Sequence, residues 1–306
     1  MTCRLIESKP FEFVVGTEKK SFSVHAEAIG KQSNALNALI NNRMKEGQSR
    51  SATFDDVDEA TFIRFCQFAY TGDYAVPIFD VMVEEASITS EAEAASDRDT
   101  RSSRDSRDET IEEAAVSPDS PFKEIYVVAP DGWGGFRRIR THSPETNPVK
   151  LPSTKIQLRQ SFEDIEYPAP ESQQQSVDEC TPRPNKSREE DYTTVLLGHA
   201  NLYVLAEKYG VDSLKALTLD KIHKTLLMFT LYHARIGDIV KLINCAYSPE
   251  NTPDHEGRVD ELRALVTHYV ACEIDTIGES ELFLSLLEEG GPFVRDFWMK
   301  VKERFM

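Results

Sequence analysis

Apolar residues at alternating and then at helical spacing predict a strand hairpin followed by two short helices near the start of the chain. FEFVVG at 11–16 and SFSV at 21–24 have the alternation of paired strands, with TEKK as the turn between them. HAEAIGKQSNALNALINN follows as two helical pieces, the second with Ser33 as its N-cap. We therefore expect a small sheet accompanied by helices.

A second unit of strand and helix is predicted directly after these helices. The strand lies around Thr53 and Phe54, and the helix begins at a cap near Asp58 and ends at Gly72. Four side chains of this helix fall on a shared face: Phe62, Phe65, Cys66 and Tyr70.

Two longer helices are predicted beyond residue 191. VLLGHANLYVLAEKYG is apolar nearly all round, which is typical of a helix buried in the middle of a domain. VDSLKALTLDKIHKTL is expected to begin at a cap formed by Asp212 or Ser213. A lone hairpin with three short helices covers its sheet poorly, so we expect residues 11–80 and 192–228 to form one discontinuous α+β domain.

The segment between these two parts, residues 81–191, is predicted to be a mostly disordered acidic insertion. Stretches such as SITSEAEAASDRDTRSSRDSRDETIEEAAVSPDS bury too little apolar surface to offset the entropy of ordering. One island, FKEIYVVAP at 122–130, has the composition of a short strand and precedes the turn DGWGG. It either adds an edge strand or docks a partner, or it is an apolar remnant without function.

Residues 229–306 are predicted to form an all-helical extension packed behind the first domain. Helical spacing of apolar residues recurs in LMFTLYHARIGDIVKLINCAYS, in RVDELRALVTHYVACEI and in a final pair of helices that ends with FVRDFWMKVKERF.

Charge and cysteine content narrow the range of partners. The 306 residues carry a formal net charge of −17, most of it in the insertion, whereas nucleic-acid and anionic membrane surfaces attract an excess of Lys and Arg. The five cysteines are scattered without a CxxC pair, and no apolar run approaches the length of a membrane span. We therefore expect an intracellular protein, cytoplasmic or nuclear, that binds proteins and neither nucleic acid nor membrane.

Few residues offer candidate chemistry, and we predict no catalytic residue, metal or cofactor. His268 and Cys272 lie four apart on one helix face, with Cys245 and His255 upstream, in a spacing that can share a zinc ion. The pair continues an apolar face, however, so packing in the core is the preferred interpretation. His25 has no nearby orienting acid or nucleophile, and its place between strand and helix favours a structural role in fastening the two together.

The order of these residues resembles the BTB/POZ domain. The family shows a histidine that leads a helix, as in FSVH ending at His25, and then a serine-capped helix, as from Ser33 to Leu39. DDVDEATFIRFCQFAYTGDY, with Tyr70 and Gly72 near its end, and LYVLAEKYGVDSLKAL match later blocks. The chain is most similar to the filamentous-fungal form, whose members often carry a long acidic linker and a helical tail.

The resemblance implies a small sheet capped by helices and a function in protein–protein interaction, either self-association or a substrate-adaptor role on the cullin of a ubiquitin ligase. Family adaptors often carry a hydrophobic-x-Glu motif after the second helix, which Met44, Lys45 and Glu46 match. A thioether adapts to a shallow apolar surface, and Glu46 could accept a charge-assisted hydrogen bond. The alternative for these residues is that Met44 covers the sheet end and Glu46 is solvated; the alternative function is an oligomeric scaffold or transcription-associated protein without a ligase role.

Overall fold

The computed structural model describes residues 5, 7–41, 45–82, 126–130, 136–140, 153–168, 177–252 and 258–302. Contacts divide the chain into two units, one of Met1–Val83 with Pro152–Met306 and one of Glu84–Leu151. Both strands and helices are present, which confirms the predicted α+β class.

The N-terminal sheet has three strands, β1 (Pro10–Val15), β2 (Lys20–His25) and β3 (Ser51–Phe54), in the order β2-β1-β3. Strand β1 pairs antiparallel with β2, so that Phe13 lies opposite Phe22, and parallel with β3. Phe11, Phe13 and Val15 are buried while the residues between them are more exposed, which is the period-two pattern of a strand with one covered face.

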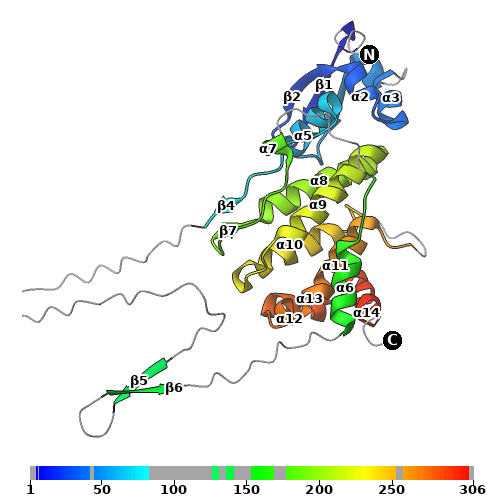
Figure 1. Ribbon diagram of the computed structural model, residues 1–306. Helices are drawn as coiled ribbons and strands as arrows, with labels where there is room; N and C mark the ends of the chain where they lie inside the picture. Colours follow the sequence, from blue (N-terminus) through cyan, green and yellow to red (C-terminus); the bar gives the residue numbers. More distant parts are fainter. Residues whose placement is uncertain are drawn as a thin grey trace, which may run out of the picture. The chain divides into compact units, whose positions relative to one another are not determined.

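Four helices accompany this sheet: α2 (Ala26–Gly30), α3 (Asn34–Asn41), α4 (Lys45–Ser49) and α5 (Glu59–Thr71). Figure 1 shows α2, α3 and α5 beside the β1–β2 hairpin. Asp58 caps α5 by accepting a hydrogen bond from Thr61 N at 2.9 Å, and Gly72 ends the helix with a φ of 83°, a conformation that favours glycine.

Helices α8 (Thr193–Tyr209) and α9 (Asp212–Met228) complete the core of this sheet, although the insertion separates them from it in the sequence. Their contribution is a set of buried apolar side chains that pack with Phe11, Phe62 and Phe65: Leu202, Leu205, Ala206, Leu214 and Leu217. The cap predicted at Asp212 or Ser213 is wrong, because α9 already begins at Asp212 and its N-cap is Val211.

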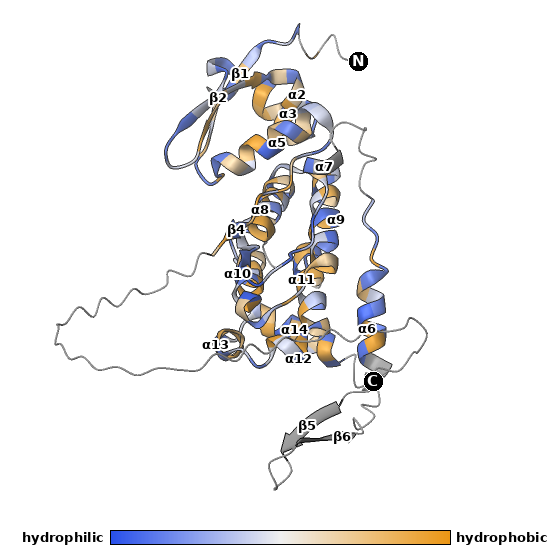
Figure 2. Cartoon of the chain, turned by 60° about the vertical axis from the view of Figure 1, so that its left-hand side comes forward, coloured by the Kyte–Doolittle hydropathy of each residue, from blue (hydrophilic) through white to orange (hydrophobic). Residues whose placement is uncertain are grey.

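A second core lies among the helices that follow, and α8 and α9 contribute to it as well. The helices that surround it are α10 (Ile236–Tyr247), α11 (Glu261–Cys272), α12 (Ile274–Ile277), α13 (Glu281–Glu289) and α14 (Pro292–Lys302), after a short 3₁₀ turn at His233–Arg235. Hydrophobic residues run along α8, α10 and α11 in Figure 2. The all-helical extension therefore shares its core with α8 and α9.

The boundary predicted for the insertion is wrong at its C-terminal end. Helix α6 (Ser153–Glu163) lies inside residues 81–191, yet its Leu158 and Phe162 are buried in the second core. These two side chains are one helical turn apart in an otherwise polar segment, so the average composition of the insertion conceals them. Helix α7 (Val177–Cys180) and strand β7 (Glu190–Asp191), which pairs with β4 (Asp80–Val81), are also part of the first unit.

The second unit contains a hairpin of β5 (Tyr126–Pro130) and β6 (Phe136–Arg140), in which Tyr126 pairs with Arg140. The apolar island predicted as a short strand thus contributes β5, and its strand partner lies in the same unit. The other residues of 83–152 lie outside the described residues.

Candidate protein-interaction surface

The residues expected to bind a partner precede strand β3 at one end of the sheet. Residues 42–44, and with them Met44, lie outside the described residues. Glu46 lies in the first turn of α4 and is half-buried, and its backbone carbonyl accepts a hydrogen bond from Ser49 Oγ at 3.4 Å. Arg50, which follows α4, donates from Nε to the carbonyl of Pro10 at 3.1 Å and so holds α4 close to the start of β1.

His25 lies at the same end of the sheet, because it pairs with Pro10 across the hairpin. Its backbone N–H donates to the hydroxyl oxygen of Tyr70 at 3.0 Å, and its Nδ1 lies 2.9 Å from the same oxygen. A tyrosine hydroxyl has one proton to donate and lone pairs to accept, so one group satisfies both atoms when the imidazole is neutral. His25 therefore joins the end of β2 to the last turn of α5. The sequence analysis expected it to fasten the strand to the helix that follows directly, which is α2.

Ser33, which was predicted as a scaffold residue, and Gln32, which was not, hold the helices around this end of the sheet. Ser33 Oγ accepts from Leu36 N at 3.1 Å and caps α3. Gln32 Nε2 donates to the carbonyl oxygens of Ala28 and Ala69, at 2.9 and 3.2 Å, and thereby ties α2 to α5. These contacts fix the backbone of α2, α3 and the last turn of α5, which carries Tyr70.

The outward side of α5 carries two large exposed side chains, of which the sequence analysis singled out Tyr70 as a structural residue and did not single out Ile63. Ile63 is 42% exposed and Tyr70 is 41% exposed. They are seven residues apart and so lie on the same helix face. An exposed aliphatic side chain and a tyrosine in line are suited to protein contacts, since tyrosine is enriched where partners bind.

A pocket of about 360 Å³ lies where the chain enters and leaves the insertion. The extended segment 75–79 forms one wall and residues from 179 to 183 form another, joined by a hydrogen bond of 3.0 Å from Val76 N to the Glu179 carbonyl. Ile78 lines it and is 81% exposed. Gly198 lets the first wall approach α8, because a Cβ there would lie 2.6 Å from Pro77 Cγ. Sequence reasoning missed the pocket since it placed the second wall inside the disordered insertion.

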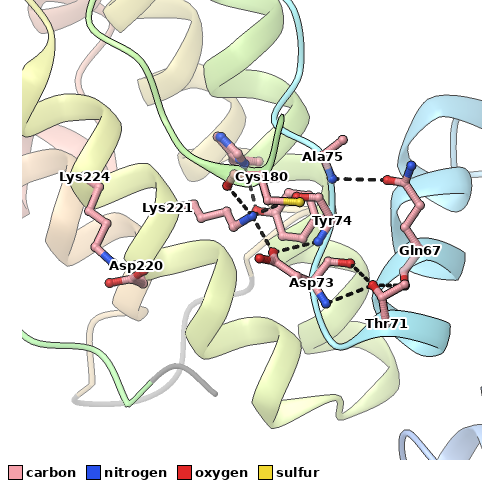
Figure 3. Close-up of polar contacts among 10 residues, drawn as sticks. Gln67, Thr71, Asp73, Tyr74, Ala75, Cys180, Asp220, Lys221 and Lys224 are labelled. Atoms are coloured by element: carbon pink, nitrogen blue, oxygen red, sulfur yellow. Dashed lines mark hydrogen bonds and ion pairs between the residues drawn. The ribbon is translucent and has the colours of Figure 1, made fainter. Parts of the chain in front are cut away.

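A buried lysine cluster holds these walls together (Figure 3). The ammonium group of Lys221, on α9, lies 2.5 Å from Asp73 Oδ1 and donates to the carbonyl oxygens of Tyr74 and Cys180 at 2.8 Å each. It also lies 4.2 Å from the centre of the Tyr74 ring. Burial lowers the pKa of Lys221, and the hydrogen bond and charge of Asp73 oppose that shift. The cluster fastens three segments that are far apart in the sequence.

Tyr74 extends this cluster to α8 through a buried hydrogen bond. Its hydroxyl lies 2.8 Å from His199 Nδ1, and the other ring nitrogen, Nε2, is buried without a hydrogen-bond partner. Burial lowers the pKa of His199 to about 3, with the positive charges of Lys221 and Arg64 acting in the same direction. His199 is therefore neutral at physiological pH and serves packing.

The cysteine and histidine residues weighed as zinc ligands do not gather into a metal site within the described residues. His268 Nε2 lies 3.0 Å from both the Leu158 carbonyl and Ser161 Oγ, so its ring joins α11 to α6. Cys272 is buried, Cys245 Sγ lies 3.6 Å from Asn201 Oδ1, and His255 lies outside the described residues.

Comparison of the chain with protein-family models, with curated proteins and with solved structures gives no match. No helix in the described part of the chain combines the length and the apolar character needed to cross a membrane.

Proposed function

We propose that this chain is a protein–protein interaction module of the BTB/POZ type that acts as a substrate adaptor on a cullin scaffold. The observation that carries the proposal is the exposed side of α5, where Ile63 and Tyr70 lie in line. Tyr70 bonds His25 at one end of the sheet, and Glu46 lies in the first turn of α4 near the same end. The exposed aliphatic and aromatic side chains offer a partner apolar area, and the half-buried carboxylate of Glu46 can accept a charge-assisted hydrogen bond.

The arrangement of elements supports the BTB/POZ part of the proposal. A hairpin, a helix led by His25, a helix capped by Ser33 and an aromatic helix ending at Gly72 follow one another in the order that the resemblance implies, with α4 and β3 between the last two helices. Leu202 and Leu205, from beyond the insertion, pack in the same core as Phe62. One domain interrupted by an insertion accounts for that packing.

The test is co-elution of the full chain with the N-terminal domain of a cullin. We expect the wild type to co-elute and Met44→Ala/Glu46→Ala to lose binding by at least about tenfold, since side chains at the centre of an interface often contribute more than 1 kcal/mol each. Glu18→Ala is the matched control, because Glu18 is exposed in the β1–β2 turn, at the opposite end of the sheet.

One outcome would refute the ligase role, and another would refute the contact assigned to Met44 and Glu46. A folded wild type that does not bind any cullin domain removes it directly. A double variant that binds as tightly as Glu18→Ala would show that Met44 and Glu46 are not the contact.

A further inference from the structure

The pocket beside the insertion has the size and the lining of a binding site. Its volume of about 360 Å³ falls within the range of about 300–1,000 Å³ that is usual for ligand pockets. Tyr192 and Val195 line it and are each 2% exposed, so they form its inner surface. Phe79 also lines it and stacks on the Tyr192 ring, with ring centres 5.4 Å apart and an angle of 10° between the planes. An inner surface of this kind is suited to an apolar side chain.

The inner surface is held in place by hydrogen bonds at both ends of Tyr192. Its backbone N–H donates to Asp238 Oδ2 at 3.0 Å, and its hydroxyl donates to the Arg183 carbonyl at 3.1 Å. The Lys221 cluster fixes the two walls from the other direction, because Lys221 bonds the Tyr74 and Cys180 carbonyls. The pocket is therefore formed before a ligand arrives, which lowers the entropy lost on binding.

The wall formed by residues 75–79 continues into a strand with one open edge. Strand β4 pairs with β7 on one side only, as Figure 1 shows, and Met82 N donates to the Glu189 carbonyl at 2.9 Å. Val81 lies between two residues whose backbone groups face β7, so its own N–H and carbonyl face the opposite edge. The backbone groups of Ile78 and Phe79 form no hydrogen bond with another described residue. An open edge of this kind can pair with an extended peptide.

The same segment carries three exposed apolar side chains: Ile78, Val81 and Met82 are 81%, 61% and 53% exposed. Clusters of exposed apolar side chains at the rim of a pocket are typical of interaction sites.

The charge around the pocket is mainly acidic. Glu179, on the opposite wall, is exposed, and its carboxylate forms no hydrogen bond or ion pair with another described residue. Asp80 on β4 and Glu190 on β7 add negative charge nearby, whereas Arg183 is the one basic residue among those that line the pocket. Together with the net charge of −17, this acidity attracts a basic partner segment.

We propose that the pocket and the open edge of β4 bind an extended basic peptide segment of another protein. A large apolar side chain of the peptide enters the pocket, a neighbouring Lys or Arg faces Glu179, and the peptide backbone pairs with the edge at Val81. The open edge favours a peptide over a small molecule as the occupant, because it supplies backbone partners along its length.

Peptide binding does not depend on a cullin, since the pocket includes neither Glu46 nor the exposed side of α5. On a substrate adaptor, the bound peptide would be the segment by which the substrate is recognised, and this assignment alone rests on the proposed function.

The first test screens the fluorescently labelled full chain, without any cullin, against a bead library of seven-residue peptides randomised at the three central positions. We expect the selected beads to combine Leu, Ile, Met or Phe at one position with Lys or Arg at a neighbouring one. Met44→Ala/Glu46→Ala should select the same sequences, which separates this site from the cullin contact. An absence of selected sequences, or selection of acidic sequences, would overturn the proposal.

The second test measures the affinity of the best selected peptide by fluorescence polarisation. Glu179→Lys should weaken binding by at least about fivefold and strengthen binding of the analogue in which Glu replaces each basic residue. Glu18→Lys is the matched control, because it makes the same change of net charge in the exposed β1–β2 turn. Equal effects of the two variants would show that Glu179 does not face the peptide.

The apolar rim and the strand edge are tested with the same peptide. Ile78→Ala should weaken binding by about fivefold or more, and Ile156→Ala, an equally conservative change at an exposed position outside the pocket, should leave it unchanged. Two copies of the peptide, N-methylated at alternate sets of backbone nitrogens, should differ in affinity by about tenfold, because only one set of N–H groups faces the edge. Equal affinities of these two copies would contradict pairing with β4.

Discussion

The buried ion pair between Lys221 and Asp73 allows a quantitative test of how α9 is fastened to the end of α5. The Lys221 side chain is 4% exposed and that of Asp73 is 14% exposed. Asp73→Asn keeps the shape of the side chain and removes its charge. The ammonium group then stays buried, where water cannot replace the lost counter-ion.

The expected loss of unfolding free energy follows from what Lys221 retains. Breaking a buried ion pair by removing one partner costs about 3–5 kcal/mol. Lys221 keeps its hydrogen bonds to the carbonyl oxygens of Tyr74 and Cys180, so we expect Asp73→Asn to cost about 2–3 kcal/mol. Lys221→Met removes the buried charge and leaves Asp73 bonded to Tyr74 N at 2.7 Å, and we expect a loss of about 1–2 kcal/mol.

The assay is urea unfolding of the full chain, followed by far-ultraviolet circular dichroism, for the two single variants and the double variant. The double variant should be less destabilised than the sum of the single changes by about 1–3 kcal/mol, because the partners contact each other. Lys224→Met is the control: Lys224 pairs with Asp220 on the same helix, but its side chain is 56% exposed, and the expected loss is below about 0.5 kcal/mol.

The free energy of unfolding should also change with pH in a definite direction. Because burial lowers the pKa of Lys221, the unfolded chain binds more protons than the folded chain between that lowered pKa and 10.5. Stability should therefore gain from Lys221 as pH rises through this window, and Lys221→Met should lack the gain. If Asp73→Asn is as stable as Lys224→Met, or if the single changes add without coupling, the role given to this pair is wrong.

Two further predictions concern the second core and α8. Phe162→Ala should lower the free energy of unfolding in urea by about 3–5 kcal/mol, because the ring is fully buried against His223 and His268. Ile156→Ala, on the exposed side of the same helix, is the control and should cost below about 1 kcal/mol. Equal losses would show that α6 is not part of the core. Burial lowers the pKa of His199 to about 3, so between pH 6.5 and pH 3 the unfolded chain binds a proton that the folded chain does not. The free energy of unfolding should therefore fall by roughly 1.4 kcal/mol per pH unit as the pH drops through this range. A nuclear magnetic resonance signal of the His199 ring that titrates near pH 6.5 would contradict this burial.

Features set by neighbouring residues could be predicted from the sequence. The cap at Asp58 and the left-handed end at Gly72 each depend on chemistry within four residues, and both are present. The alternation of Phe11, Phe13 and Val15 also predicts its own buried face. Local rules suffice where the stabilising group and the stabilised group belong to one turn or one strand.

The buried lysine cluster could not be predicted in this way. Lys221 bonds the Tyr74 carbonyl across 147 positions of sequence, and no local pattern reports that distance. The one available signal was its place in α9, where Leu217 and Thr225, one turn away on either side, are both buried. A lysine inside an apolar stripe indicates a buried partner, although the stripe does not identify the partner.

The all-round apolar character of helix α8 is explained only by the complete fold. A helix that is apolar all round must be covered on every side, and the two cores supply that cover: Leu202 and Leu205 face the sheet, while Leu196 and Tyr203 face the helical extension. Neither core can lose α8 without exposing part of the other. The sheet and the extension should therefore unfold together, because the same buried helix is part of both.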